Sequence, residues 1–201
     1  QFPPVADDVF DALREFSNGQ VRSPPEVDWL GVVIFAHDEQ AGIRQIPGVW
    51  GWRWWPAMGG KYTLDLMEHV ILRKRMIEPR IHFVLVCASR GCPLLENRAF
   101  DTEHLEARLD RAAVNYLYRD RKVQIDKAGN AVRLPQIFNW FAEDFTPDPE
   151  TAVFFERYPR EAIGPLTWVY RYANAEDREF MRQGKFELSY LEYDWALNDR
   201  R

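Results

Sequence analysis

The sequence predicts an α+β fold, in which a small mixed or antiparallel sheet is packed by several helices. Short apolar segments and segments with helical spacing are interleaved, but they do not alternate as regularly as in a parallel α/β sheet. The chain of 201 residues, 46% of them hydrophobic, is also long enough to bury one core without disulfide or metal staples. We therefore expect a single domain over residues 1–201, for which a papain-like or transglutaminase-like arrangement is one candidate.

The first sixty residues are predicted to contain one helix and one strand before a long loop. Asp7 and Asp8 precede a helical stretch that runs to about Phe16. A run of β-branched and aromatic residues predicts a strand over 27–36. Residues 37–60 contain repeated Pro and Gly and are expected to form a long, structured loop.

The next segments are predicted to be a helix, a buried strand, a loop and a second helix. Thr63 as N-cap and apolar residues at helical spacing predict a helix over 63–76. The nearly all-apolar run 81–86 predicts a short strand that is buried on both faces. A loop over 87–93 follows it, and apolar spacings of three and four predict the second helix over 102–118.

A hairpin is predicted after this helix, because Lys127-Ala128-Gly129-Asn130 forms a turn signal between the segments 122–126 and 131–134. Helical spacing and strand-like alternation predict the remaining elements. They are a helix that begins at Pro135, helices over 150–158 and 175–183, and a closing strand over 185–195.

The charge of the chain excludes some classes of function. With 26 Lys and Arg against 31 Asp and Glu, the net charge is −5, and a nucleic-acid partner would need a basic face that Arg73-Lys74-Arg75 is too short to supply. The longest apolar run, 29–36, has eight residues and is much shorter than the ~20 that cross a bilayer. We expect no membrane span, no cofactor and no metal, and a small-molecule or peptide-like partner.

The densest cluster of reactive side chains lies between residues 68 and 92. Its members are Glu68, His69, His82, Cys87, Ser89 and Cys92. A thiol attacks as its thiolate, which a neighbouring imidazole favours, and a carboxylate or amide can orient the imidazole. The cluster therefore contains the side-chain types of a thiol nucleophile and its base.

Each reactive residue also has a structural interpretation. Cys87 ends the predicted strand, where a cysteine is often a small buried hydrophobe, and His82 fits a satisfied core histidine. Cys92 lies between Gly91 and Pro93, a context that can turn sharply and offer amides to an anionic intermediate. A disulfide between the two cysteines and a zinc site are alternatives, but we predict that neither cysteine is paired.

The tryptophan segment, Trp50–Pro56, is the second candidate site. If it is extended, Trp50, Trp52 and Trp54 line one face and can stack a sugar, a base or a proline-rich peptide. Arg53 can support this face by cation–π packing. The alternative is that these rings cover the core beneath a long loop.

Four segments carry a resemblance to a known family. They are Tyr62–Arg73, Pro79–Leu94, Ile137–Phe145 and Tyr193–Asn198. In this order they resemble the domain of unknown function 547 family over about residues 60–198. The chain lacks the family's upstream Ile-Asn-x-Tyr-Asn-Ala helix, of which Phe10-Asp11-Ala12-Leu13 is a faint echo, so residues 1–60 are a divergent N-terminal part.

The resemblance implies a polar site but no established reaction. The matching positions are Glu68, His69, Arg73, His82, Cys87, Ser89, Cys92, Asp194 and Asn198. Many bacterial members are exported, so the resemblance slightly favours a periplasmic or secreted protein.

The resulting hypothesis is a cysteine-dependent hydrolase or acyl-transferase that acts on a peptide-like, amide or ester substrate. Cys92 is the predicted nucleophile, His69 its base, and Asp194 or Asn198 the group that orients the base. Further catalytic candidates are Cys87, His82 and Glu68, and the binding candidates are Arg73, Ser89, Arg90, Trp52, Trp54 and Asn198. The alternative is a non-catalytic ligand- or protein-binding domain that uses the tryptophan segment.

Overall fold

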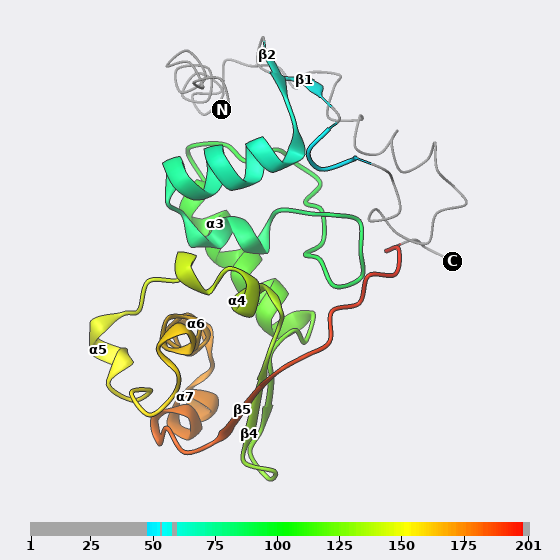
Figure 1. The fold of residues 1–201 in the computed structure, drawn as a ribbon. Helices are drawn as coiled ribbons and strands as arrows, with labels where there is room; N and C mark the ends of the chain where they lie inside the picture. The colour runs from blue at the N-terminus through cyan, green and yellow to red at the C-terminus, as the bar shows by residue number, and fades with distance from the viewer. Residues whose placement is uncertain (1–47, 53, 58–59, 199–201) are drawn as a thin grey trace. The chain divides into compact units, whose positions relative to one another are not determined.

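The computed structural model places most of the chain after residue 47 (Figure 1). The residues it describes are 48–52, 54–57 and 60–198. The predicted helix that ends near Phe16 and the predicted strand over 27–36 lie outside them.

Two compact units divide the described residues. Unit 1 consists of the described parts of 48–76, 86–108 and 195–198, and unit 2 consists of 77–85 and 109–194. The single domain over residues 1–201 stays a prediction.

The first two strands described in unit 1 form a short hairpin. Strand β1 (Trp55–Ala57) pairs antiparallel with strand β2 (Gly60–Tyr62), and Trp55 lies opposite Tyr62. This hairpin falls at the end of the segment that was expected to be a loop.

The helix predicted over 63–76 is confirmed as η3 (Leu66–Met76), which has π-helical hydrogen bonding. Thr63 caps it as predicted, because its Oγ1 accepts the N–H of Leu66 at 3.1 Å. Leu66 and Ile71 are buried together with Tyr62 in a small apolar cluster. The helix thus packs on the end of the hairpin that precedes it.

Buried Arg108 organises a loop of unit 1, over residues 96–100. It lies near the start of α3 (Leu105–Val114), and its guanidinium donates to Glu96 at 2.9 Å, to the carbonyl of Arg98 at 2.7 Å and to the carbonyl of Ala99. The same group lies over the ring of Phe100. One side chain thereby satisfies several polar groups of an irregular segment.

In unit 2, the strand predicted over 81–86 is wrong. Pro79–Phe83 form the 3₁₀ helix η4, with Pro79 in its first turn and Glu78 as the N-cap that accepts the N–H of Arg80. Every residue of η4 after Pro79 is buried. A short apolar run can be buried as a helical turn or as a strand, and periodicity alone does not separate the two.

The mixed sheet of unit 2 confirms the predicted hairpin and closing strand. β3 (Gln124–Asp126) pairs antiparallel with β4 (Ala131–Leu134), and β4 pairs parallel with β5 (Glu187–Tyr190). Asn130 ends the hairpin turn with a φ of 51°. The closing strand is shorter than the predicted range 185–195.

Helices make up most of the remainder of unit 2. The helix predicted over 102–118 is confirmed as α3 and its π-helical continuation, and the helix predicted from Pro135 as α4 with η6. The segments are η5 (Asn115–Arg119), α4 (Ile137–Trp140), η6 (Ala142–Asp144), α5 (Pro149–Ala152), α6 (Arg160–Tyr172) and α7 (Ala175–Arg182). The helix predicted over 150–158 is reduced to α5, whereas α7 is confirmed and ends before Gly184, whose φ is 57°.

Helix α6 is the longest α-helix among the described residues, and it was not among the predicted elements. Its buried side chains include Ala162, Leu166 and Val169, which recur at helical spacing and enter the main apolar core of the unit. The fold is therefore α+β with a small mixed sheet, as predicted, and the papain-like arrangement stays a prediction. No helix in the described part of the chain is long and apolar enough to span a membrane.

Candidate functional site

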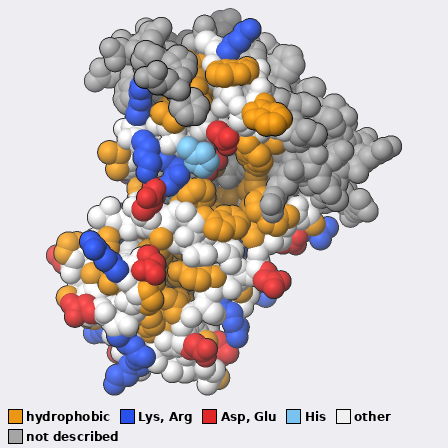
Figure 2. Space-filling view, in the orientation of Figure 1, with side chains coloured by type: hydrophobic (Ala, Val, Ile, Leu, Met, Phe, Trp, Pro, Cys, Tyr) orange, Lys and Arg blue, Asp and Glu red, His pale blue; other side chains and the backbone are white. Residues whose placement is uncertain are grey.

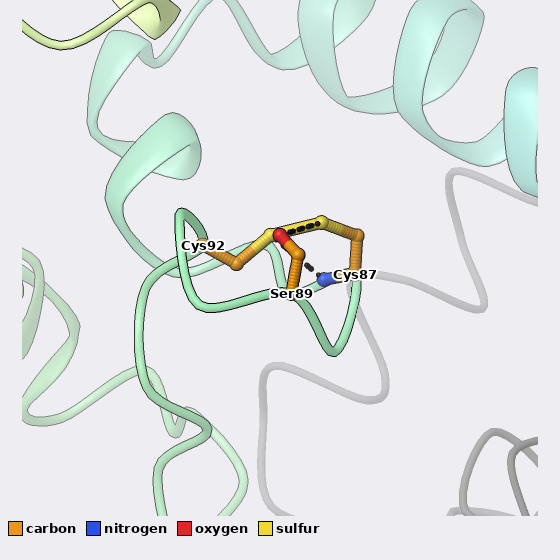
Figure 3. Close-up of a disulfide and its surroundings, with 3 residues drawn as sticks. All are labelled: Cys87, Ser89 and Cys92. Carbon is orange, nitrogen blue, oxygen red and sulfur yellow. Dashed lines mark hydrogen bonds between the residues drawn. A yellow bond between two sulfur atoms is a disulfide. The ribbon is translucent and has the colours of Figure 1, made fainter. Parts of the chain in front are cut away.

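Cys87 and Cys92 form a disulfide, so the prediction that neither cysteine is paired is wrong (Figure 3). Their Cα atoms lie 6.1 Å apart, within the usual range for a disulfide. The chain reverses direction between them, and Ala88 takes a φ of 57° in this turn. A five-residue separation is compatible with pairing because this turn brings the two Cβ atoms face to face.

The disulfide lies in a mostly buried polar loop. Cys92 is 8% exposed, and its Sγ accepts the N–H of Cys87 at 3.0 Å. Sγ of Cys87 lies 3.2 Å from Oγ of Ser89, whose side chain is buried (Figure 3). In this oxidised form Cys92 is not a thiol nucleophile.

The disulfide loop pairs with the segment Trp195–Asn198. Ser89 forms an isolated antiparallel bridge with Leu197. The N–H of Arg90 donates to the carbonyl of Ala196 at 2.9 Å, and the N–H of Asn198 donates to the carbonyl of Ala88 at 2.8 Å. Three predicted site residues, Ser89, Arg90 and Asn198, are thus brought together through their backbones.

The tryptophan segment lies against the same loop. Val49 is fully buried, and Trp50, Leu64 and Cys87 pack against it. Residues 48–52 form a turn in which the N–H of Trp52 donates to the carbonyl of Gly48 at 3.0 Å. The N–H of Asp65 donates to the carbonyl of Trp50 at 3.1 Å and fixes the turn to the start of the next helix.

The tryptophan segment has one anchored tryptophan and two exposed ones. Trp50 is partly buried in the Val49 cluster, whereas Trp52 is 83% and Trp54 52% exposed. The face shared by all three rings in an extended segment is therefore not formed. Arg53, expected to support that face, lies outside the described residues.

His69, the predicted base, lies on η3 among side chains of its own helical face. Its Nδ1 is 3.2 Å from Nη1 of Arg73, and its Nε2 is 3.9 Å from Oδ1 of Asp65. Glu68 precedes it on the same helix. Asp65 was not among the predicted site residues, although its i,i+4 spacing to His69 is a signal that could have identified it.

His82 belongs to unit 2 and is a buried partner of Asp144. Its Nε2 lies 2.8 Å from Oδ2 of Asp144, and its ring stacks on Phe141 with the centroids 4.4 Å apart. The surroundings agree with the interpretation as a satisfied core histidine. Asp144 is 62 positions away, and no local pattern in the sequence connects the two residues.

The predicted triad has two candidates for the group that orients the base, and they belong to different units. Asn198 belongs to unit 1 with Cys92 and His69, whereas Asp194 is the last residue of unit 2. The triad therefore stays a prediction. Within residues 48–198, as far as they are described, no group of three or more His, Cys, Asp and Glu side chains is arranged to hold a metal ion.

Comparison with known proteins gives one family. The family model described as "Protein of unknown function, DUF547" matches residues 53–117. This range includes two of the four resembling segments, Tyr62–Arg73 and Pro79–Leu94, but not the two later ones. No curated protein and no solved structure matches the chain. Over residues 53–117 the chain therefore resembles the DUF547 family, whose function is unknown.

Proposed function

We propose that unit 1 is a non-catalytic binding domain that takes a proline-rich segment of a partner protein on Trp52 and Trp54. One observation carries this proposal: Trp52, at the end of the 48–52 turn, and Trp54, two residues beyond it, are both more than half exposed, whereas Trp50 of the same turn is anchored. Large aromatic side chains bury much area on binding, so their exposure is a feature of binding surfaces. Hydrophobic side chains also reach the surface among charged ones in Figure 2.

The anchoring of the turn supports this proposal. Two backbone hydrogen bonds and the packing of Trp50 on Val49 hold the turn 48–52, which ends at Trp52. Cys87 packs on Val49 as well, so the disulfide braces the same cluster. A rigid surface loses little conformational entropy when it binds, which improves affinity.

The composition of the segment favours a peptide over a sugar or a base. Residues 48–57 contain one charged residue, Arg53, and no Asn, Gln, Asp, Glu, Ser or Thr. A sugar is held by several planar polar side chains, and a nucleic acid is disfavoured by the net charge of −5. A proline-rich peptide presents flat apolar rings in a preformed extended helix and is recognised by aromatic surfaces.

Fluorescence anisotropy tests the proposal with labelled decaproline and a library of labelled decapeptides that contain the spacing Pro-x-x-Pro. We expect at least one peptide to bind, and Trp52→Ala and Trp54→Ala to weaken its binding by about tenfold or more. Trp140→Ala, which removes an exposed tryptophan of unit 2, is the matched control and leaves peptide binding unchanged. Failure of every peptide to bind, or equal binding by all three variants, refutes the proposal.

A thiol-dependent acyl transfer or hydrolysis by the reduced protein is a second candidate. It is favoured by the N–H of Cys87, which lies 3.0 Å from Sγ of Cys92 and would stabilise a thiolate there after reduction. The thiolate would attack the acyl carbonyl, the leaving group would depart with a proton, and water would release the acyl group from the thioester.

Two measurements on the reduced protein test this candidate. The pH midpoint for alkylation of Cys92 should lie below the ~8.5 of a free thiol, and His69→Ala should restore an ordinary value. A burst of p-nitrophenol from p-nitrophenyl acetate should be lost in Cys92→Ser and kept in Cys87→Ser. A midpoint for Cys92 alkylation near that of a free thiol, together with no burst of p-nitrophenol, would contradict the thiol-dependent activity.

A further inference from the structure

We infer that a surface cleft of unit 2 binds a neutral saccharide, independently of the peptide proposed for unit 1. The cleft has a volume of about 680 Å³, within the range of small-molecule sites. It lies between the α4–η6 segment and the first turns of α6, elements that lie side by side (Figure 1). Its lining residues include Asn139, Trp140, Glu143, Arg160, Glu161 and Gly164.

Trp140 supplies an apolar platform in this cleft. Its side chain is 45% exposed, and its ring packs at a tilt against Tyr193 with the centroids 4.9 Å apart. Ile137 and Phe138, on the same short helix, are buried in the core and fix the position of the platform. The flat face of an indole is suited to the C–H face of a pyranose ring.

The polar side chains of the cleft are of the kind that bind hydroxyl groups. Asn139, Glu143, Arg160 and Glu161 are exposed, and each ends in a planar group with two or more donors or acceptors. The Asn139 amide is oriented by its donation to Oε1 of Gln136 at 3.1 Å. Such groups can hold neighbouring hydroxyls of one sugar in pairs.

The charges of the cleft disfavour an anionic ligand, because the carboxylates of Glu143 and Glu161 outnumber the guanidinium of Arg160. A neutral polyhydroxyl compound meets no such repulsion and can both donate to the carboxylates and accept from the guanidinium. A saccharide combines this property with an apolar ring face.

Backbone atoms form a rigid side of the cleft at Gly164. A Cβ atom at this position would overlap the carbonyl oxygen of Phe145, so α6 approaches the α4–η6 segment directly. Oγ1 of Thr167, one turn further along α6, donates to the carbonyl of Gly164 at 2.7 Å. The cleft is therefore built by close packing of core elements and is formed before a ligand arrives.

Isothermal titration calorimetry of the full chain with cellotriose, maltotriose and chitotriose tests the inference. We expect at least one trisaccharide to bind with a Kd below about 10 mM, and we expect Trp140→Ala to raise that Kd by about tenfold or more. Trp140→Phe keeps a flat ring and restores most of the affinity, which separates loss of the platform from loss of the fold. Trp52→Ala, the control in unit 1, leaves saccharide binding unchanged.

The selectivity for a neutral ligand is tested with trigalacturonic acid. This acidic trisaccharide should bind more weakly than the best neutral one. The double variant Glu143→Gln/Glu161→Gln should make the two affinities more similar. The inference is overturned if none of the neutral sugars binds, if Trp140→Ala binds as well as the unmodified chain, or if the acidic sugar binds more tightly. None of these results bears on peptide binding by Trp52 and Trp54.

Discussion

Nε2 of His82 lies 2.8 Å from Oδ2 of Asp144 in the interior of unit 2, where the two side chains are 2% and 12% exposed. His104 and Asp101 form a pair of the same length, but their side chains are 61% and 48% exposed. Water can replace a lost partner at the surface, whereas a buried polar group that loses its partner stays unsatisfied. The two pairs should therefore contribute differently to the free energy of unfolding, although their N···O distances are the same.

We expect His82→Ala to lower the free energy of unfolding by about 3 kcal/mol, because it removes a buried hydrogen bond to Asp144 and creates a cavity beside Phe141. The matched variant His104→Ala should leave the free energy of unfolding nearly unchanged. Urea unfolding of both variants measures the difference. Equal losses of stability would show that burial of the first pair has no energetic consequence.

The disulfide should protect both cysteines and stabilise unit 1. Intact mass after alkylation under denaturing conditions should show no label without reductant and two labels after reduction. Reduction should lower the free energy of unfolding by about 2 kcal/mol, the loop-entropy value for so short a loop. Cys87→Ser/Cys92→Ser should be as stable as the reduced protein and insensitive to reductant. Labelling of either cysteine before reduction would refute the pairing.

Gly164→Ala should destabilise the chain strongly, because the added methyl group meets the backbone carbonyl of Phe145 and α6 would have to shift. Gly129→Ala is the matched control, since there the nearest atoms belong to the carboxylate end of Asp126, which can turn away. We expect a fall in melting temperature of about 10 °C or more for the first variant and a small change for the second. Similar melting temperatures would contradict the close packing of α6.

The stability of unit 2 should fall in acid because of the carboxylates around Arg80. The buried guanidinium lies 2.6 Å from Oε2 of Glu78 and 3.0 Å from Oδ1 of Asp110. Burial raises the pKa of Glu78, but its hydrogen bonds with Arg80 outweigh burial and hold that pKa below its ordinary 4.5. Burial likewise raises the pKa of Asp110, and hydrogen bonds from Tyr172 and Arg80 bring it below its ordinary 3.8.

A pKa that is lower in the folded than in the unfolded state adds stability above the unfolded value, and this stability is lost as pH falls through the folded value. We therefore expect the free energy of unfolding to decline as pH drops below about 4.5. Glu78→Gln should make this decline shallower, because one of the two carboxylates no longer titrates. Chemical denaturation at a series of pH values measures both slopes, and identical slopes would contradict the assignment.

The elements that the sequence predicts correctly depend on local signals. The turn at Lys127–Asn130 defines the hairpin, and Gly184 supplies the positive φ after α7. Helix α6 was missed because Gly164 and Pro165 interrupt its helical pattern. The burial of Leu166 and Val169 in the core offsets the cost of these two residues, and that contribution comes from tertiary packing.

The candidate site was harder to predict because its contacts join distant segments. Ala88 takes a positive φ in the turn that lets Cys87 reach Cys92. A glycine at this position would have indicated such a turn in the sequence, but an alanine does not. The pairing of the disulfide loop with Trp195–Asn198 and the contact of His82 with Asp144 arise only when separate parts of the chain meet. Residue types identified the candidates, but tertiary folding determines their partners.

The pairing of Arg90 with Ala196 also orders the events of synthesis. Ribosomes synthesise the chain from its N-terminus. Every described residue of unit 2 is therefore made before Trp195–Asn198, the last described segment of unit 1. A nascent chain that has reached residue 194 thus has all of unit 2 but lacks the segment that pairs with Ala88 and Arg90. Unit 1 completes its folding after unit 2 has been synthesised.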